Sequence, residues 1–159
     1  MILPRFWGRN ERPLGLTTIE LLIAMMIMAT LASLGASLYP NTLNNARIAK
    51  AIADIRVLEK EILVFQRLKG EFPNNLSQIG RGTLLDPYGN PYQYLNGADV
   101  GKGKGDSRKD KNLVPINSDF DLYSMGQDGQ SVPPLTGKQS WDDIVRAADG
   151  GFVGLAPEF

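Results

Sequence analysis

The chain contains no cysteine and no histidine among its 159 residues. The absence of cysteine excludes a disulfide framework and every metal site built on thiolates. The absence of histidine removes the side chain that most often acts as a general base near neutral pH, so the usual catalytic triads lack their base. We therefore predict that this protein is not an enzyme.

An excess of positive charge is also lacking, because 17 basic residues balance 17 acidic ones. Residues 1–15 hold three arginines and one glutamate, so the remainder of the chain carries slightly more acidic than basic residues. A mildly acidic surface provides no electrostatic basis for binding phosphate backbones. We expect no nucleic-acid partner.

Long apolar runs are absent except for one, which extends from Leu16 to Tyr39 and holds a single charged residue, Glu20. As a helix this run would span roughly 36 Å, enough to cross a bilayer core of about 30 Å. Pro40 follows it and predicts a kink or weak point. Residues 1–15 are basic and contain no continuous apolar stretch.

Three interpretations of this N-terminal region compete. An ordinary secretory signal has a shorter apolar segment followed by a small-residue cleavage site, and here the apolar run is too long. A plain membrane anchor explains the length but not Glu20, because a carboxylate inside the bilayer costs several kcal/mol. The third interpretation depends on the residues that surround Glu20.

The segment Gly15-Leu16-Thr17-Thr18-Ile19-Glu20-Leu21-Leu22 resembles the prepilin cleavage motif of type IV pilins and type II secretion pseudopilins. The resemblance implies that residues 1–15 are a leader, which prepilin peptidase removes on the cytoplasmic side by cutting between Gly15 and Leu16. The new N-terminus at Leu16 would then be methylated. Family members most often begin with phenylalanine, so Leu16 departs from the pattern.

Glu20 becomes the fifth residue of the processed chain, and a carboxylate at that depth persists only if it is paired or hydrogen-bonded. After the implied cut, the amine of Leu16 on a neighbouring subunit would lie in the same plane of the membrane. We predict that Glu20 pairs with that amine during assembly and so sets the axial step of a filament. The alternative is that Glu20 reaches the lipid headgroups from the first helical turn.

After Pro40 the apolar residues fall on one helical stripe, which predicts an amphipathic helix over 41–69. The stripe consists of Ile48, Ile52, Ile55, Leu58, Ile62 and Phe65. Gly70 and Pro73 end it. We predict an α+β fold in which one long helix, membrane-spanning over 16–40 and amphipathic over 41–69, packs on a small C-terminal antiparallel sheet with long loops over 72–159. Residues 41–159 would form a periplasmic head.

Within the head, Tyr92–Leu95 and Phe120–Met125 are strand candidates. The polar, glycine-rich stretch 97–112 between them is expected to be a solvated loop or a filament-surface contact. Its faint likeness to a phosphate-binding loop fails in spacing, so we reject nucleotide binding. The segment 142–148 is helix-like, Trp141 is a core or loop anchor, and 149–151 is a turn before an apolar, strand-like end.

The segments 86–94 and 119–129 closely resemble the head of the major pseudopilin of type II secretion systems. In that family the loop after the last strand binds calcium. The resemblance implies that Asp128, Asp142 and Asp143, with the carbonyl of Met125, are calcium ligands. Carboxylates and carbonyls form the hard oxygen site that calcium prefers. The alternative is that these aspartates only cap turns.

The resemblance implies a structural subunit that polymerises with itself into a periplasmic pseudopilus and drives protein export. It would work with minor pseudopilins and an inner-membrane assembly platform, with its N-terminus cytoplasmic and its head periplasmic. One alternative is a type IV pilus subunit for adhesion, motility or DNA uptake. Another is a membrane-anchored periplasmic domain that never polymerises.

Overall fold

The structure is a computed structural model that describes residues 15–97 and 107–159. The predicted leader before Gly15 and most of the 97–112 loop therefore lie outside the described residues. The chain divides into two compact units, with the boundary between Asn41 and Thr42.

One long helix, α1 (Thr18–Lys69), contributes to both units. In the first unit its segment Thr18–Gly35 has a mean hydropathy of 1.9, and none of it is buried in the structure. Within the described residues, this segment is the single candidate for a membrane-spanning helix by its length and apolar composition. A helix that is apolar all round and exposed needs a nonaqueous environment or partner helices.

In the second unit, α1 is amphipathic as the sequence predicts. Ile55, Leu58 and Ile62 are fully buried, and Ile48 and Ile52 pack beside them. Phe65, at the end of the predicted stripe, is half-buried. The helix ends at Lys69, where the Gly70 amide donates to the Gln66 carbonyl at 2.8 Å, so the predicted end is confirmed.

The head contains a four-stranded antiparallel sheet in the order β1-β2-β3-β4. Its strands are β1 (Gln93–Leu95), β2 (Asp121–Ser124), β3 (Ile144–Ala147) and β4 (Phe152–Leu155). Four short 3-10 helices complete the described elements: η1 (Leu76–Ile79), η2 (Lys138–Ser140), η3 (Ala148–Gly150) and η4 (Ala156–Glu158). Both strand candidates are confirmed, and so is the predicted α+β fold.

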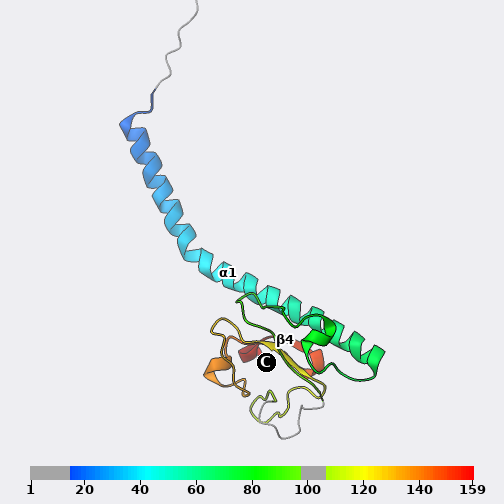
Figure 1. The fold of residues 1–159 in the computed structure, drawn as a ribbon. Helices are drawn as coiled ribbons and strands as arrows, with labels where there is room; N and C mark the ends of the chain where they lie inside the picture. Colours follow the sequence, from blue (N-terminus) through cyan, green and yellow to red (C-terminus); the bar gives the residue numbers. More distant parts are fainter. Residues whose placement is uncertain (1–14, 98–106) are drawn as a thin grey trace, which may run out of the picture. The chain divides into compact units, whose positions relative to one another are not determined.

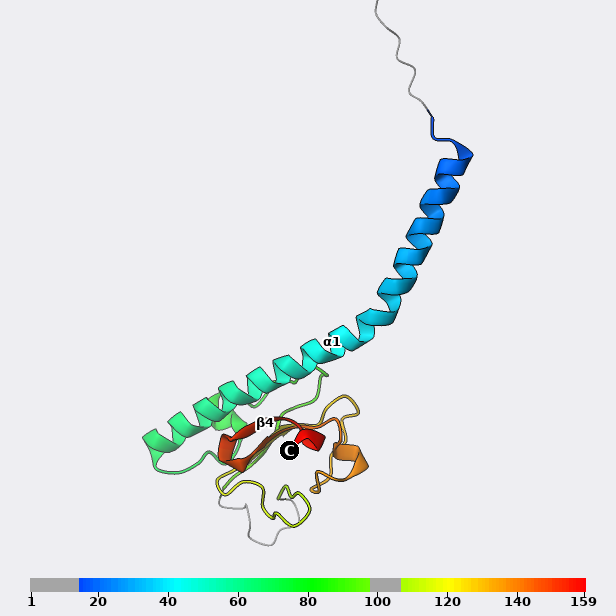
Figure 2. The same ribbon diagram turned by 180° about the vertical axis from the view of Figure 1, so that it is seen from behind.

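The sheet is covered on both faces. One face packs on α1 through a cluster that includes Phe120, Leu122 and Ile144, and both ribbon views show the later part of α1 lying along this face (Figures 1 and 2). The opposite face is covered by Ile116, Leu135 and Ala156, which pack on Val145 and Ala147. Successive strand residues point to opposite faces, so β3 contributes to both clusters.

This second layer explains one wrong prediction. Residues 142–148 were expected to be helix-like, but Ile144–Ala147 form β3, and all four residues are buried. Alternation of apolar and polar residues identifies a strand only when one of its faces is exposed. Trp141 just before β3 is 55% exposed, and its indole N–H donates to the Thr136 carbonyl, so it anchors a loop and not the core.

The predicted turn at 86–91 is organised by a buried carboxylate. One oxygen of Asp86 accepts the amide hydrogens of Tyr88 at 2.9 Å and Asn90 at 2.8 Å. The other oxygen accepts the hydroxyl hydrogen of Ser124, the last residue of β2, at 2.5 Å. The Asn90 side chain then donates to the carbonyl of Gly126 at 3.0 Å. The turn is thereby fixed to the start of the loop that follows β2.

Candidate functional site

The first candidate site is the N-terminus of α1, where Thr17 and Glu20 bind each other. The Thr17 amide and hydroxyl each donate to Glu20 Oε2 at 2.8 Å, and the Glu20 amide donates to Thr17 Oγ1 at 3.3 Å. This reciprocal pattern is a capping box, with Thr17 as the N-cap and Glu20 three residues later. Helix α1 therefore begins just after the predicted cleavage point.

The capping box was not predicted, although its signal is present in the sequence. Thr17-Thr18-Ile19-Glu20 is the pattern of threonine, two residues and glutamate that starts many helices. Among the described residues, the hydrogen bonds to the Glu20 carboxylate end on Oε2. Glu20 Oε1 thus faces no described donor, and Leu16, which would carry the new amine, is 79% exposed.

The four predicted calcium ligands lie in the loop between β2 and β3. Asp128 is exposed, and its amide donates to Asp142 Oδ2 at 2.9 Å. The carboxylate of Asp128 accepts the Gln130 amide hydrogen at 2.7 Å. Asp128 therefore forms the local turn hydrogen bond of the capping alternative, whereas Asp142 links two distant parts of the loop. Met125 directly follows β2 and is half-buried.

Asp143 has different surroundings from its neighbour Asp142. It is completely buried, and its Oδ2 accepts hydrogen bonds from Arg108 at 2.5 Å and from the Ser131 hydroxyl at 2.6 Å. Across residues 15–97 and 107–159, no three acidic side chains gather in a metal-binding arrangement. The described side chains thus form no ready cluster of carboxylates for a calcium ion, and calcium binding stays a prediction of the resemblance.

Arg108 was missed entirely, because the sequence places it in a stretch that reads as a solvated loop. The structure buries it to 2% exposure against the face of the sheet that points away from α1. Its guanidinium lies 4.3 Å from the centre of the Tyr123 ring, and its amide donates to Asp121 Oδ2 at 2.8 Å. An isolated arginine in a polar, glycine-rich segment gives no signal of burial.

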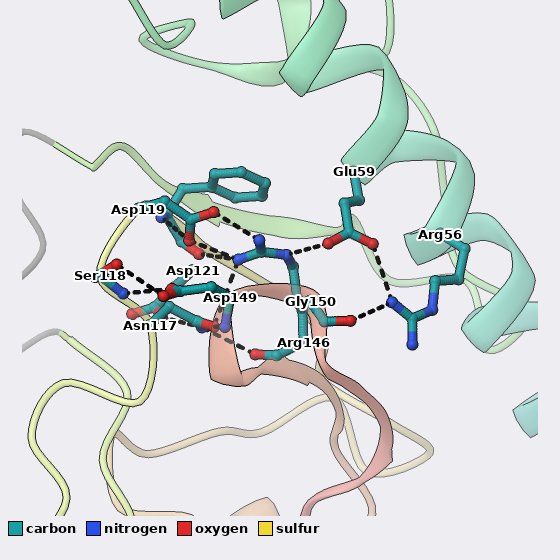
Figure 3. Close-up of polar contacts among 10 residues, drawn as sticks. Arg56, Glu59, Asn117, Ser118, Asp119, Asp121, Arg146, Asp149 and Gly150 are labelled. Atoms are coloured by element: carbon teal, nitrogen blue, oxygen red, sulfur yellow. Dashed lines mark hydrogen bonds and ion pairs between the residues drawn. The ribbon is translucent and has the colours of Figure 1, made fainter.

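The second buried arginine, Arg146, projects from β3 toward α1 (Figure 3). Its Nε donates to Glu59 of α1 at 2.8 Å, and its two terminal nitrogens form a fork with Asp119 at 2.7 and 2.6 Å. The Phe120 carbonyl accepts a further bond at 3.0 Å, and the guanidinium lies 4.0 Å from the centre of the Phe120 ring. The network joins the helix to the sheet and to the loop before β2.

The carboxylates of Glu59 and Asp119 fully compensate the positive charge of Arg146. Burial alone would lower the pKa of Arg146, but its hydrogen bonds to Asp119 and Glu59 hold that pKa above its ordinary value. Arg56 extends the network by donating to Glu59 at 3.1 Å and to the Gly150 carbonyl at 2.6 Å. A buried ion pair of this kind fixes one arrangement of its elements, since removing either partner leaves an unpaired charge.

Replacing Gly150 with alanine should destabilise the head by about 2–4 kcal/mol. Gly150 has a φ of +89°, which costs an L-residue about 1–2 kcal/mol, and an added Cβ would overlap Glu59 Oε1, the atom that binds Arg146. The matched control is Gly80→Ala, where φ is +74° but the Cβ would meet nothing within 4 Å. Equal losses of thermal stability in the two variants would show that the network is not involved.

Comparison with known proteins gives two relatives. No family model and no solved structure matches the chain. Over 149 residues it is 26% identical to the type II secretion system core protein G of Aeromonas hydrophila, covering 77% of this chain and 89% of the relative. The core protein G of Pseudomonas aeruginosa is 28% identical over 137 residues, covering 73% and 84%.

The resemblance to the major pseudopilin is confirmed. The match to the core proteins G covers most of their length, so it includes far more than the short N-terminal motif. Both core proteins G are named as components of a secretion system and not as enzymes. The cleavage, assembly and metal residues of this pseudopilin-like chain remain predictions.

Proposed function

We propose that this chain is a structural subunit of a type II secretion pseudopilus. The similarity to two core proteins G along most of their length is the observation that carries the proposal. The structure adds a compatible design: an apolar, exposed helix that begins beside the predicted cut, followed by a compact head. The helix would anchor the subunit in the inner membrane and, after assembly, form the core of a filament.

The helix N-terminus suggests how subunits engage one another. Thr17 holds Glu20 Oε2 within its own chain, while Oε1 is directed to no donor among the described residues. After a cut at Gly15, the positive amine of Leu16 on an adjacent subunit can bind Oε1. Pairing would offset the cost of several kcal/mol that an isolated carboxylate incurs in the membrane. Each added subunit would thereby be placed at one axial step.

Processing is tested by mass spectrometry of the chain isolated from membranes of a host that has prepilin peptidase. We expect a mature form that begins at Leu16 and carries one methyl group on its amine. As a control, Gly15→Val should keep the full-length mass, because the peptidase of this family cuts after glycine. A wild-type chain that retains Met1 in that host would contradict the proposal.

The cellular location of the assembled protein distinguishes a secretion pseudopilus from a surface pilus. A pseudopilus stays in the cell envelope, so shearing intact cells should release little of the mature chain. Recovery of most of the mature chain in long sheared fibres would contradict a secretion role, even if processing is as expected.

A further inference from the structure

The resemblance implies a calcium ion in the loop between β2 and β3. The guanidinium of Arg108 lies among the residues of this same loop. The guanidinium is buried and binds three groups of the loop. Nη1 donates to the Ser131 hydroxyl at 2.5 Å and to the Val132 carbonyl at 2.7 Å, while Nη2 donates to Asp143 at 2.5 Å. A carboxylate, a hydroxyl and a carbonyl are also the oxygen groups that calcium binds.

We propose that the Arg108 guanidinium serves as an internal cation that holds the β2–β3 loop in place of calcium, so that folding of the head does not require the metal. Asp143, one of the predicted calcium ligands, is the counter-charge. The proposal concerns the head alone, and it holds or fails independently of whether the chain assembles into a pseudopilus.

The balance of charges around Asp143 also favours arginine over a calcium ion. A calcium ion bound through Asp143 would lie beside the positive guanidinium, and two cations in a buried environment repel each other strongly. Arg108 already neutralises Asp143, because its Nη2 binds Asp143 Oδ2 at 2.5 Å and both side chains are buried. The Asp128 carboxylate accepts the Gln130 amide hydrogen, and Asp142 Oδ2 accepts the Asp128 amide hydrogen.

The position of Arg108 along the chain also supports the proposal. The residue belongs to the 97–116 segment, which is outside the stretches that resemble the major pseudopilin. The Lys109 amide donates to the Pro133 carbonyl at 3.0 Å, and the Leu135 amide donates to the Lys109 carbonyl at 2.8 Å. The described residues Arg108 and Lys109 are therefore attached to the β2–β3 loop by backbone hydrogen bonds as well as by the guanidinium.

One detail of the arginine–aspartate pair is unusual. Arg108 Nε and Asp143 Oδ1 are both buried and have no hydrogen-bond partner among the described residues. Nε and Nη2 lie on one edge of a guanidinium and can bind both oxygens of a carboxylate side by side. A small rotation toward that two-bond arrangement, or one water molecule between the unpaired atoms, would satisfy both groups.

The test is thermal unfolding of the full chain in detergent, with EGTA or with calcium chloride at about 5 mM, which exceeds the Kd of ordinary extracellular calcium sites. We expect the wild-type Tm to be the same in both conditions. A genuine calcium site filled well above its Kd would raise the Tm by roughly 4–10 °C. Isothermal titration of the wild type with calcium chloride should likewise give no binding heat, and this measurement depends on no variant.

Arg108→Met should lower the Tm in EGTA by roughly 10 °C, because the buried Asp143 loses its cation. The matched control, Lys109→Met, removes the same charge from the adjacent residue, which is half-buried and has no described ion pair among residues 107–159. We expect a shift of about 2 °C or less there. The double variant Arg108→Met with Asp143→Leu should recover much of the loss, since no charge is then buried alone.

Calcium that raises the Tm of Arg108→Met but not of the wild type would support the proposal further, because the metal then replaces the missing guanidinium. Calcium that raises the wild-type Tm, or that binds the wild type by titration, would overturn it. So would an Arg108→Met chain that folds with an unchanged Tm in EGTA.

Discussion

Arg146→Met should cost the head about 3–5 kcal/mol of unfolding free energy, the largest stability effect that we expect from a single substitution. Arg146 is fully buried between Glu59 of α1 and Asp119 of the loop before β2. Methionine retains the packing on Phe120 but leaves two carboxylates without their shared cation. The network joins α1 to the sheet, so its loss should lower the free energy of unfolding of the whole head. Urea unfolding followed by circular dichroism measures this free energy.

The control for this substitution is Arg81→Met. Arg81 forms a two-bond pair with Glu61, but the two side chains are 42% and 32% exposed, and exposed pairs contribute about 1 kcal/mol or less. Arg146→Met combined with Glu59→Gln and Asp119→Asn should recover part of the loss. If Arg146→Met and Arg81→Met were equally mild, the network would not be the principal link between α1 and the sheet.

Glu20→Gln should reduce assembly by about 100-fold at each subunit contact while leaving the subunit folded and in the membrane. The estimate corresponds to an unpaired amine or carboxylate that costs about 3 kcal/mol in the bilayer. Glutamine also serves in a capping box, so this variant keeps the Thr17 hydrogen bond and removes the charge alone. Filament yield can be measured by electron microscopy of the envelope fraction.

Thr17→Val supplies the complementary variant, because it keeps the charge of Glu20 and removes the hydroxyl that binds it. It should weaken the start of α1 by about 1 kcal/mol and still allow filaments to form. The opposite pattern, with filaments lost in Thr17→Val and kept in Glu20→Gln, would mean that Glu20 acts only as a helix cap.

Features of the sequence that depend on local chemistry predicted the structure well. The apolar stripe with Ile55 and Ile62, the helix end at Gly70 and the turn at Asp86 each follow from residues close together in the chain. The N-terminal motif and the head motif likewise identified the relatives. The Thr17–Glu20 box was equally local and could have been found by the same reasoning.

Features created by distant segments could not be predicted. β3 looked helix-like because Ile116 and Leu135, from the loops before and after β2, cover its second face and remove the alternation of a half-exposed strand. Arg108 and Arg146 gave no sign of burial, since an arginine is buried only where other segments bring carboxylates and carbonyls to it. The predicted ligands Asp142 and Asp143 are adjacent in sequence but serve different partners.

We propose that this chain is a structural subunit of a type II secretion pseudopilus, and the extracellular proteome of a strain that lacks it tests that proposal most directly. We predict that a defined set of proteins disappears from the medium and is retained in the periplasm. The wild-type gene should restore their export, and the Glu20→Gln gene should not. An extracellular proteome that is unchanged by the deletion would contradict the proposal.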